Sequence, residues 1–167
     1  MKKAVLLLPA ALAPMHKDHV KILEIAKEIL EKKGLEVTHA YLLPSSEKYV
    51  SNKTGGHFLD SLEIRVNLCR LATKDNDWIN VLDWGMASGN QACSLIKKTM
   101  HPDTNVFIVA KADTSRNKKN PFLIVVPRSE DSASSTKVRE AIFKKERKSL
   151  YELVGKEVGD EIIKLSV

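Results

Sequence analysis

Apolar residues along the chain form two kinds of pattern, which alternate from one end to the other. Five short runs are apolar without interruption, as expected for parallel strands that are buried on both faces of a sheet. These runs cover residues 4–8, 37–43, 79–82, 106–110 and 123–126. We therefore predict a strand at each of them.

Amphipathic segments lie between these runs and predict helices. Residues 19–32 place Ile22, Ala26, Ile29 and Leu30 on one stripe, and Gly34 then follows the expected helix end. Similar stripes cover residues 59–69, 92–96, 138–142 and 158–165. The polar stretches 45–56 and 114–120 are expected to be loops. This alternation predicts an α/β fold: residues 1–167 form a single Rossmann-like domain, a mostly parallel five-stranded sheet with helices on both faces.

Composition is that of an ordinary globular protein, with 167 residues, 43% hydrophobic and 29% charged. Collagen-like, coiled-coil, disordered and membrane-spanning classes are excluded. The net charge of +6 is concentrated in residues 111–148, which hold eleven Lys or Arg and five Asp or Glu. Such a basic segment suits a polyanion, namely a nucleotide, a nucleic acid or a membrane surface, although a solvated surface explains it equally well.

The N-terminus has two interpretations. Lys2 and Lys3, an apolar run and Ala13 resemble a short secretory signal. A buried first strand over residues 4–9 is the reading we prefer, because cleavage after Ala13 would remove the start of the segment discussed next. The two cysteines, Cys69 and Cys93, lack metal-site spacing. We therefore expect a reduced, cytoplasmic protein.

Candidate chemistry begins just after the first strand. Ligands of parallel α/β sheets bind beyond the carboxyl ends of the strands, which directs attention to residues 9–19. His16 and His19 stand three apart near the start of a helix, where neutral imidazoles and helix N-terminal amides can donate hydrogen bonds to a phosphate. A zinc pair would more usually be four apart with a Glu between. Two ordinary surface histidines are the competing interpretation.

A second candidate segment, residues 132–139, follows the last predicted strand and opens a helix. Hydroxyl side chains at a helix N-terminus together with Lys137 and Arg139 form an anion-binding arrangement. Basic side chains in a first helical turn oppose the helix dipole unless an anion binds there. An ordinary Ser/Thr cap is the alternative.

Taken together, the two segments resemble the nucleotidyltransferase superfamily, with its His-x-Gly-His and Ile-Ser-Ser-Thr-x-x-Arg motifs. The middle of the chain narrows this resemblance. Residues in the spacing R-V-x4-L-A-T-K-x3-W-x2-V-x2-W are Arg65, Val66, Leu71, Ala72, Thr73, Lys74, Trp78, Val81 and Trp84. This block is similar to the nicotinamide/nicotinate mononucleotide adenylyltransferases, particularly the eukaryotic type, and Pro44 and Tyr49 fit the same pattern.

The resemblance implies an enzyme that transfers the adenylyl group of ATP, with Mg²⁺, to nicotinamide or nicotinate mononucleotide. It implies no nucleic-acid or membrane partner and leaves a homo-oligomer open. Carried over by position, the catalytic contacts are His16, His19 and Arg139, and the further ATP contacts are Ala10, Ala11, Ser134, Ser135 and Thr136. The implied mononucleotide contacts are Trp84, which would stack on the pyridine ring, and Lys53. Asp113 is a looser match to a family Gly-x-Asp position.

Three positions depart from the family pattern. Ala10 stands where a glycine would let a phosphate approach the backbone closely. Asp18 stands between the histidines, where a carboxylate would repel a triphosphate unless Mg²⁺ intervenes. Gly85 replaces an acidic residue after Trp84. Two alternatives therefore stay open: the same fold with another acceptor, such as phosphopantetheine or a cytidylyl-type substrate, and a relative that binds a nucleotide without catalysis.

Overall fold

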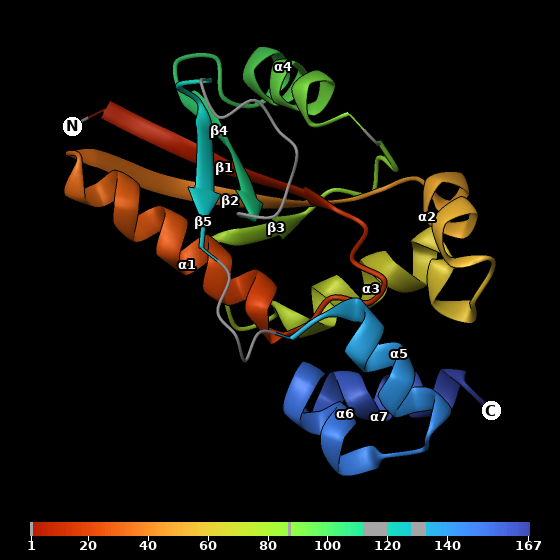
Figure 1. Ribbon diagram of the computed structural model, residues 1–167. Coiled ribbons are helices and arrows are strands. Elements are labelled where there is room, and N and C mark those ends of the chain that lie inside the picture. The colour runs from red at the N-terminus through yellow and green to blue at the C-terminus, as the bar shows by residue number, and fades with distance from the viewer. Residues whose placement is uncertain (1, 87, 112–119, 128–132) are drawn as a thin grey trace.

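A computed structural model of the protein describes residues 2–86, 88–111, 120–127 and 133–167. Its five strands are β1 (Lys2–Ala10), β2 (Leu35–Pro44), β3 (Ile79–Val81), β4 (Asn105–Lys111) and β5 (Leu123–Val126). Every strand pair is parallel, and the order across the sheet is β3-β2-β1-β4-β5. The prediction of a five-stranded parallel α/β sheet is confirmed (Figure 1).

The central strand β1 shows why continuous apolar runs form this sheet. Leu6 and Leu8 point into one buried cluster, while Val5 and Leu7 point into another on the opposite face. Side chains alternate between the faces of a strand, so a strand covered on both sides needs apolar residues at every position. The N-terminal segment thus forms the predicted strand in the middle of the sheet.

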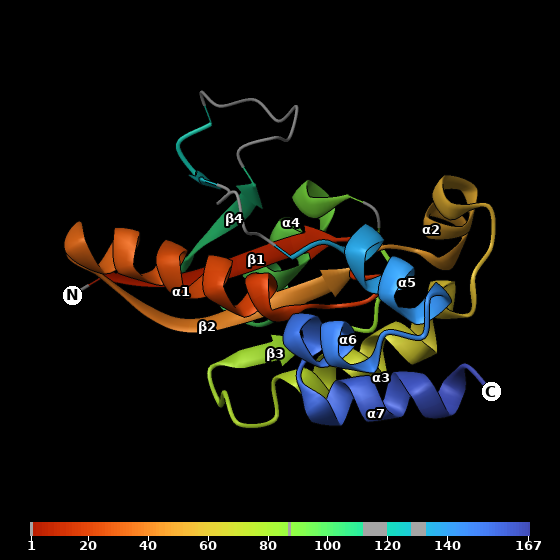
Figure 2. The ribbon, with the colours of Figure 1, turned by 60° about the horizontal axis from the view of Figure 1, so that its bottom comes forward.

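Helices cover both faces of the sheet, as predicted. The helices are α1 (Lys17–Lys32), α2 (Glu47–Thr54), α3 (Leu62–Ala72), α4 (Gly89–Thr99), α5 (Ser135–Phe143), α6 (Arg147–Val154) and α7 (Lys156–Leu165), with one 3₁₀ turn, η1 (Phe58–Asp60). Apolar buried residues of α1 and Cys69 of α3 belong to the cluster on one face, and Ala92 and Ile96 of α4 belong to the cluster on the other. Figure 2 shows α4 and α7 on opposite sides of the strands.

The last three helices form a group of their own beside α3 (Figures 1 and 2). A third buried cluster joins them, with Leu68 from α3, Val138 from α5, Leu150 from α6 and Ile162 from α7. Burial of such side chains stabilises by roughly 1.5–3 kcal/mol each. This cluster holds α5, whose first turn is a candidate anion site, at a fixed place beside α3.

The prediction of a loop over residues 45–56 is wrong for α2. Ser46 caps this helix, since its Oγ accepts a hydrogen bond from the Tyr49 N–H at 3.3 Å, and Gly55 ends it with φ +81°. Only Val50 of this helix is buried, so its sequence carries no apolar stripe. Capping, rather than amphipathicity, was the available signal. Of the other predicted loop, residues 114–119 lie outside the described residues.

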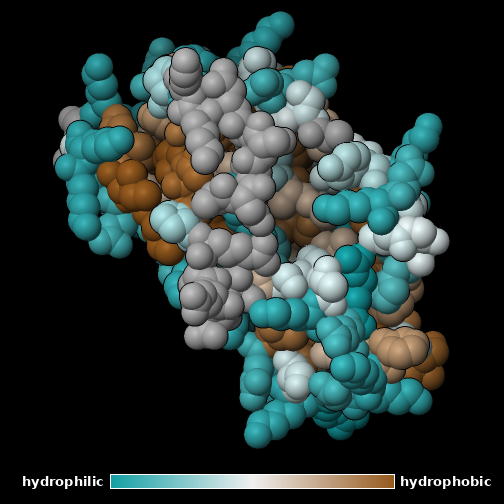
Figure 3. Space-filling view, in the orientation of Figure 1, coloured by the Kyte–Doolittle hydropathy of each residue, from teal (hydrophilic) through white to brown (hydrophobic). Residues whose placement is uncertain are grey.

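The described part of the chain contains no helix that is both long enough and apolar enough to span a bilayer. Hydrophilic residues predominate on the face drawn in Figure 3, and apolar surface is confined to patches. Neither Cys69 nor Cys93 forms a disulfide bond within the described part of the chain. Burial raises the pKa of the Cys69 thiol to about 12, so this group stays protonated inside the core at neutral pH.

Candidate active site

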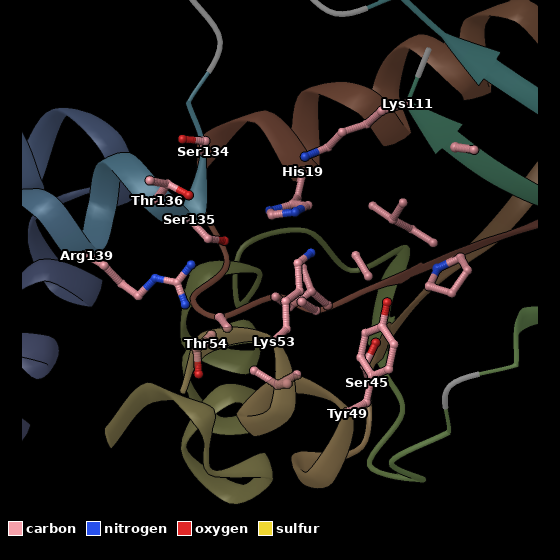
Figure 4. Close-up of a pocket in the computed structure, with 18 of the residues that line it drawn as sticks. His19, Ser45, Tyr49, Lys53, Thr54, Lys111, Ser134, Ser135, Thr136 and Arg139 are labelled. Atoms are coloured by element: carbon pink, nitrogen blue, oxygen red, sulfur yellow. The ribbon is translucent and has the colours of Figure 1, made fainter. Parts of the chain in front are cut away.

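A cavity of about 590 Å³ lies at the carboxyl ends of β1 and β4. These strands are neighbours in the sheet, whereas the chain crosses from β1 to β2 on the other side, so the cavity lies where the strand order reverses. Parallel α/β proteins bind ligands at this switch point. Four parts of the chain line the cavity (Figure 4): residues 8–13, at the end of β1 and just beyond it, with His19; Ser45, Tyr49, Val50, Lys53 and Thr54; residues 109–111; and Ser134, Ser135, Thr136 and Arg139.

The first segment, residues 10–16, closes the end of β1 without a glycine. Ala10 belongs to the strand, and the left-handed backbone falls on Leu12, with φ +51°. This conformation costs a residue with a Cβ roughly 1–2 kcal/mol. The Leu12 side chain is 1% exposed in the core, and this burial offsets the cost. Ala10 and Ala11 line the cavity, so the backbone reaches it without a glycine, and their contact with ATP stays a prediction.

Arg65 holds this segment from beneath. Its side chain is fully buried, donating from Nη1 to the Ala11 carbonyl at 2.8 Å and from Nε to the Asp60 carbonyl at 3.0 Å. Burial lowers the pKa of this guanidinium, and the nearby Asp60 carboxylate is among the groups that oppose the shift. Arg65 belongs to the sequence block that carries the family resemblance. Its hydrogen bond to the first segment gives a structural explanation for an arginine at this position of the block.

His16 and His19 lie together, as their spacing predicts. Their ring centroids are 4.0 Å apart, and the His16 backbone N–H donates to Nδ1 of His19 at 3.1 Å. Burial, assisted by the charges of His16 and Lys111, holds the pKa of His19 well below its usual value. The imidazole is therefore neutral at pH 7. Because Nδ1 accepts a hydrogen bond, the proton is on Nε2, which makes His19 a neutral donor.

His16 differs from His19 in its place. It is 3% exposed and precedes the first residue of α1, but it does not line the cavity among the described residues. Its backbone N–H fixes the ring of His19. The predicted direct contact of His16 with ATP stays a prediction.

The second segment, residues 133–139, brings donors to the cavity at the start of α5. Ser134 caps the helix, since its Oγ accepts from the Lys137 N–H at 3.1 Å, and Ser135 and Thr136 supply the first-turn amides. Arg139 lies one turn further and lines the cavity (Figure 4). Within the described part of the chain, its Nη1 is buried with no hydrogen-bond partner. Its charge also contributes, after burial, to a lowered pKa of His57.

Two hydrogen bonds join the two segments. The Ala133 N–H donates to Oδ2 of Asp18 at 2.6 Å, and the Ser135 hydroxyl donates to the Pro14 carbonyl at 3.1 Å. Asp18 is not among the described residues that line the cavity, and the expectation that its carboxylate repels a triphosphate unless Mg²⁺ intervenes stays a prediction. One oxygen of its carboxylate instead accepts from the backbone of the other segment.

The opposite wall of the cavity comes from α2. Lys53 lines it, as the resemblance implied, and so does Tyr49, whose ring is half exposed. The helix end is held by Asp60, whose Oδ2 accepts from the Thr54 hydroxyl at 2.6 Å and from the His57 N–H at 2.8 Å. Motif reasoning did not assign Ser45, Tyr49, Thr54 or Lys111 to the site. For Tyr49 the signal was its fit to the family pattern, and for Lys111 its basic segment.

Trp84 does not line this cavity. The indole is partly buried against the core cluster under α4. Among the described residues, Tyr49 is the one Phe, Tyr or Trp side chain in the lining. Gly85, where an acidic residue was expected, has φ +61°, and a Cβ there would lie 2.8 Å from Leu62 Cδ2. A side chain at this position would therefore be strained and crowded. Asp113 lies outside the described residues.

Metal ligands are not gathered here. Across residues 2–86, 88–111, 120–127 and 133–167, no group of three or more His, Cys, Asp or Glu side chains is placed to hold a metal ion. The charged side chains lining the cavity are Lys53, Lys111 and Arg139. These positively charged side chains suit phosphate groups. A divalent cation would enter the cavity bound to the phosphates of the ligand.

Solved structures define the class of this fold. A putative nicotinate-nucleotide adenylyltransferase from Vibrio parahaemolyticus matches with a TM-score of 0.67 and 17% identity, over 98% of this chain and 99% of that chain. The Plasmodium falciparum nicotinic acid mononucleotide adenylyltransferase complexed with NaAD matches with a TM-score of 0.68 and 13% identity, over 99% and 97%. The protein therefore has the same α/β fold as these two structures.

Sequence comparison points to one branch of that class. Half of the chain, 84 residues, is 31% identical to nicotinamide/nicotinic acid mononucleotide adenylyltransferase 2 of Caenorhabditis elegans, and this match covers 36% of that relative. The chain thus spans about a third of the length of the curated relative. No protein-family model matches. These similarities confirm the resemblance to the nicotinamide/nicotinate mononucleotide adenylyltransferases that the motifs indicated.

Proposed function

We propose that the protein transfers the adenylyl group of ATP to nicotinamide or nicotinate mononucleotide, forming the dinucleotide and releasing pyrophosphate. The observation that carries the proposal is one cavity lined by a neutral histidine donor, a helix N-terminus and an arginine whose buried Nη1 has no hydrogen-bond partner among the residues that the structure describes. Each of these groups binds phosphate oxygens. The relatives named above have this activity in their names.

In this reaction a phosphate oxygen of the mononucleotide attacks the α-phosphorus of ATP. The bond from that phosphorus to the bridging oxygen breaks, and pyrophosphate leaves with the bonding electrons. No covalent intermediate on the protein is required, so catalysis consists of positioning and charge stabilisation. Mg²⁺ enters bound to the phosphates of ATP, as part of the substrate.

The residues divide this work according to their places. Nε2–H of His19 donates to a phosphate oxygen without adding a full charge. The amides of Ser135 and Thr136 and the guanidinium of Arg139 hold the leaving phosphates. Lys53, on the opposite wall, meets the phosphate of the mononucleotide, and Tyr49 offers a ring surface for its base. Stacking of Trp84 on the pyridine ring, the role of Asp113 and a cytoplasmic location stay predictions.

For the acceptor of the adenylyl group, a second candidate remains. Stacking by Trp84 was the sequence argument for a pyridine ring, and that side chain packs against the core under α4. Another phosphorylated acceptor, such as phosphopantetheine, therefore stands as the second candidate. Both candidates use the same ATP-binding groups.

Pyrophosphate release tests the proposal directly. Purified protein with ATP and Mg²⁺ is offered nicotinamide mononucleotide, nicotinate mononucleotide, phosphopantetheine or a cytidylyl-type substrate pair. We expect release with the pyridine mononucleotides and a dinucleotide product by chromatography. Release with phosphopantetheine alone would assign the second candidate. Binding of ATP with no release for any acceptor would identify a non-catalytic nucleotide-binding protein.

A further inference from the structure

Asp18 is an unusual residue at the edge of a phosphate-binding cavity. It follows Lys17, the first residue of α1, and so lies within one residue of His19. A carboxylate lining the cavity would oppose a triphosphate. The structure instead directs one oxygen to the Ala133 N–H at 2.6 Å, a link across 115 residues of sequence.

This link connects the two segments that carry the phosphate-binding groups. His19 follows Asp18 directly, and Ala133 immediately precedes the cap residue Ser134. A second hydrogen bond, from the Ser135 hydroxyl to the Pro14 carbonyl, joins the same two regions of the chain. The distance between the His19 ring and the amides of α5 is therefore set by two hydrogen bonds.

The two bonds differ in strength. A neutral hydroxyl-to-carbonyl bond at 3.1 Å is an ordinary contact, whereas a carboxylate acceptor at 2.6 Å is charge-assisted and about twice as strong. If the stronger bond were lost, the weaker hydrogen bond from Ser135 to Pro14 would remain between α5 and the first segment. Small displacements of this kind cost about 10²-fold in rate in reactions that depend on positioning.

We propose that Asp18 is a positioning residue: its bond to the Ala133 backbone aligns the histidine donor with the amides of α5 around one phosphate chain. The proposal rests on the adenylyl-transfer function for its kinetic consequence. Its geometric consequence, the protection of one backbone amide, does not depend on any reaction.

The test compares Asp18→Ala, which removes the acceptor, with Asp18→Asn, which keeps an oxygen for the Ala133 N–H. Glu24→Ala, an exposed carboxylate further along α1, is the matched control. We expect Asp18→Ala to lower kcat about 10- to 100-fold with a change of less than about 5-fold in KM for the mononucleotide. We expect Asp18→Asn to recover most of that loss, and Glu24→Ala to behave as wild type.

Amide hydrogen exchange supplies the second readout. In Asp18→Ala the Ala133 amide should exchange at least about 10-fold faster than in wild type and Asp18→Asn, while the core amides of β1 remain unchanged. Equal exchange in all three proteins overturns the proposal. Equal loss of kcat in Asp18→Ala and Asp18→Asn also overturns it, since the charge rather than the hydrogen bond would then matter.

The two proposals fail in different ways. If wild type binds ATP without transfer, the function fails, and the Asp18 assignment is decided by ATP affinity and by Ala133 exchange. If wild type transfers and Asp18→Ala matches it, the function stands and the positioning role is refuted. If wild type does not bind ATP at all, the proposed function is refuted, and Ala133 exchange alone decides whether the Asp18 bond holds the start of α5.

Discussion

The two segments that flank the cavity are built in opposite ways. The first, residues 10–16, is mostly buried, and the buried guanidinium of Arg65, from α3, donates to its backbone at the Ala11 carbonyl. The second, residues 133–139, is half exposed and is held at its edge by Asp18 and Ser135. Arg65 Nη2 beneath the first segment and Arg139 Nη1 in the second are both buried without a hydrogen-bond partner among the described residues, but of the two side chains Arg139 is the one that lines the cavity. Residues 10–16 therefore form a first wall of the cavity, which gives the site its shape. Residues 133–139 form a second wall, which brings positive charge to the cavity.

Replacing Arg65 breaks the first wall and has the largest expected effect. Arg65→Met leaves the carbonyls of Ala11 and Asp60 buried without donors, so we expect the free energy of unfolding to fall by about 2–5 kcal/mol. Chemical denaturation measures it. Arg70→Met, an exposed arginine of the same helix paired with Asp83 at 3.9 Å, is the control and should change stability by less than about 0.5 kcal/mol. Similar losses in both variants would contradict the supporting role of Arg65.

His19 lies on α1, three residues after the end of the first wall. Its substitution tests whether this side of the cavity takes part in the chemistry. We expect His19→Ala to lower the transfer rate by about 10²-fold or more with a modest change in ATP affinity, because its hydrogen bond strengthens as charge develops. Single-turnover rates and ATP titration separate the two quantities. His39→Ala, on β2 outside the cavity lining, serves as the control. A loss confined to ATP affinity would reassign His19 to ground-state binding.

Arg139 tests the second wall. Arg139→Ala should weaken ATP binding about 10- to 150-fold, the equivalent of roughly 1.5–3 kcal/mol, and leave mononucleotide binding nearly unchanged. Calorimetric titration of each ligand measures both affinities. Equal ATP affinity in wild type and variant would falsify the assignment of phosphate binding to α5.

Low pH should lower the free energy of unfolding through His19, beside the first wall. Burial holds the folded-state pKa of His19 well below the usual value near 6.5, so in this range the unfolded chain binds more protons than the folded one. Stability is therefore fully present above about pH 6.5 and decreases as the pH falls toward the folded-state pKa. His19→Gln should flatten this decrease between pH 7 and 5. Parallel stability curves for wild type and variant would exclude the effect.

The smallest effects belong to the basic residues beyond the second wall. Single alanine variants of Lys144, Lys145, Arg147 and Lys148 should change ATP affinity less than about 2-fold, because these side chains are exposed and screened. Lys144 is already paired with Glu140 at 2.7 Å. A nucleic-acid interface predicts the reverse, with each residue contributing to duplex binding and affinity falling steeply with salt. Titration of a short duplex against the same variants decides the matter.

Strands and site contacts differed in how far the sequence could predict them. A continuous apolar run such as residues 4–8 identifies a doubly buried strand by itself, and all five predicted strands occur. The helix α2 was missed because one buried residue leaves no stripe. The contact of Arg65 with Ala11 spans 54 residues, and that of Asp18 with Ala133 spans 115, so no local pattern contains either. Motif resemblance located Lys53 and Arg139 in the cavity, but it could not show that Trp84 packs against the core instead.

The hydrogen bond between Ser135 and Pro14 also has a consequence for synthesis on the ribosome. Its two partners are separated by 121 residues, so the nascent chain completes the first wall long before the second exists. Strands β1, β2 and β3 with α1 and α3 all lie within the first 81 residues and can assemble early. A ribosome that stalls before residue 133 therefore carries the N-terminal strands without the first turn of α5. Under the proposed function, ATP binding requires that α5 has been synthesised and has packed beside the N-terminal half.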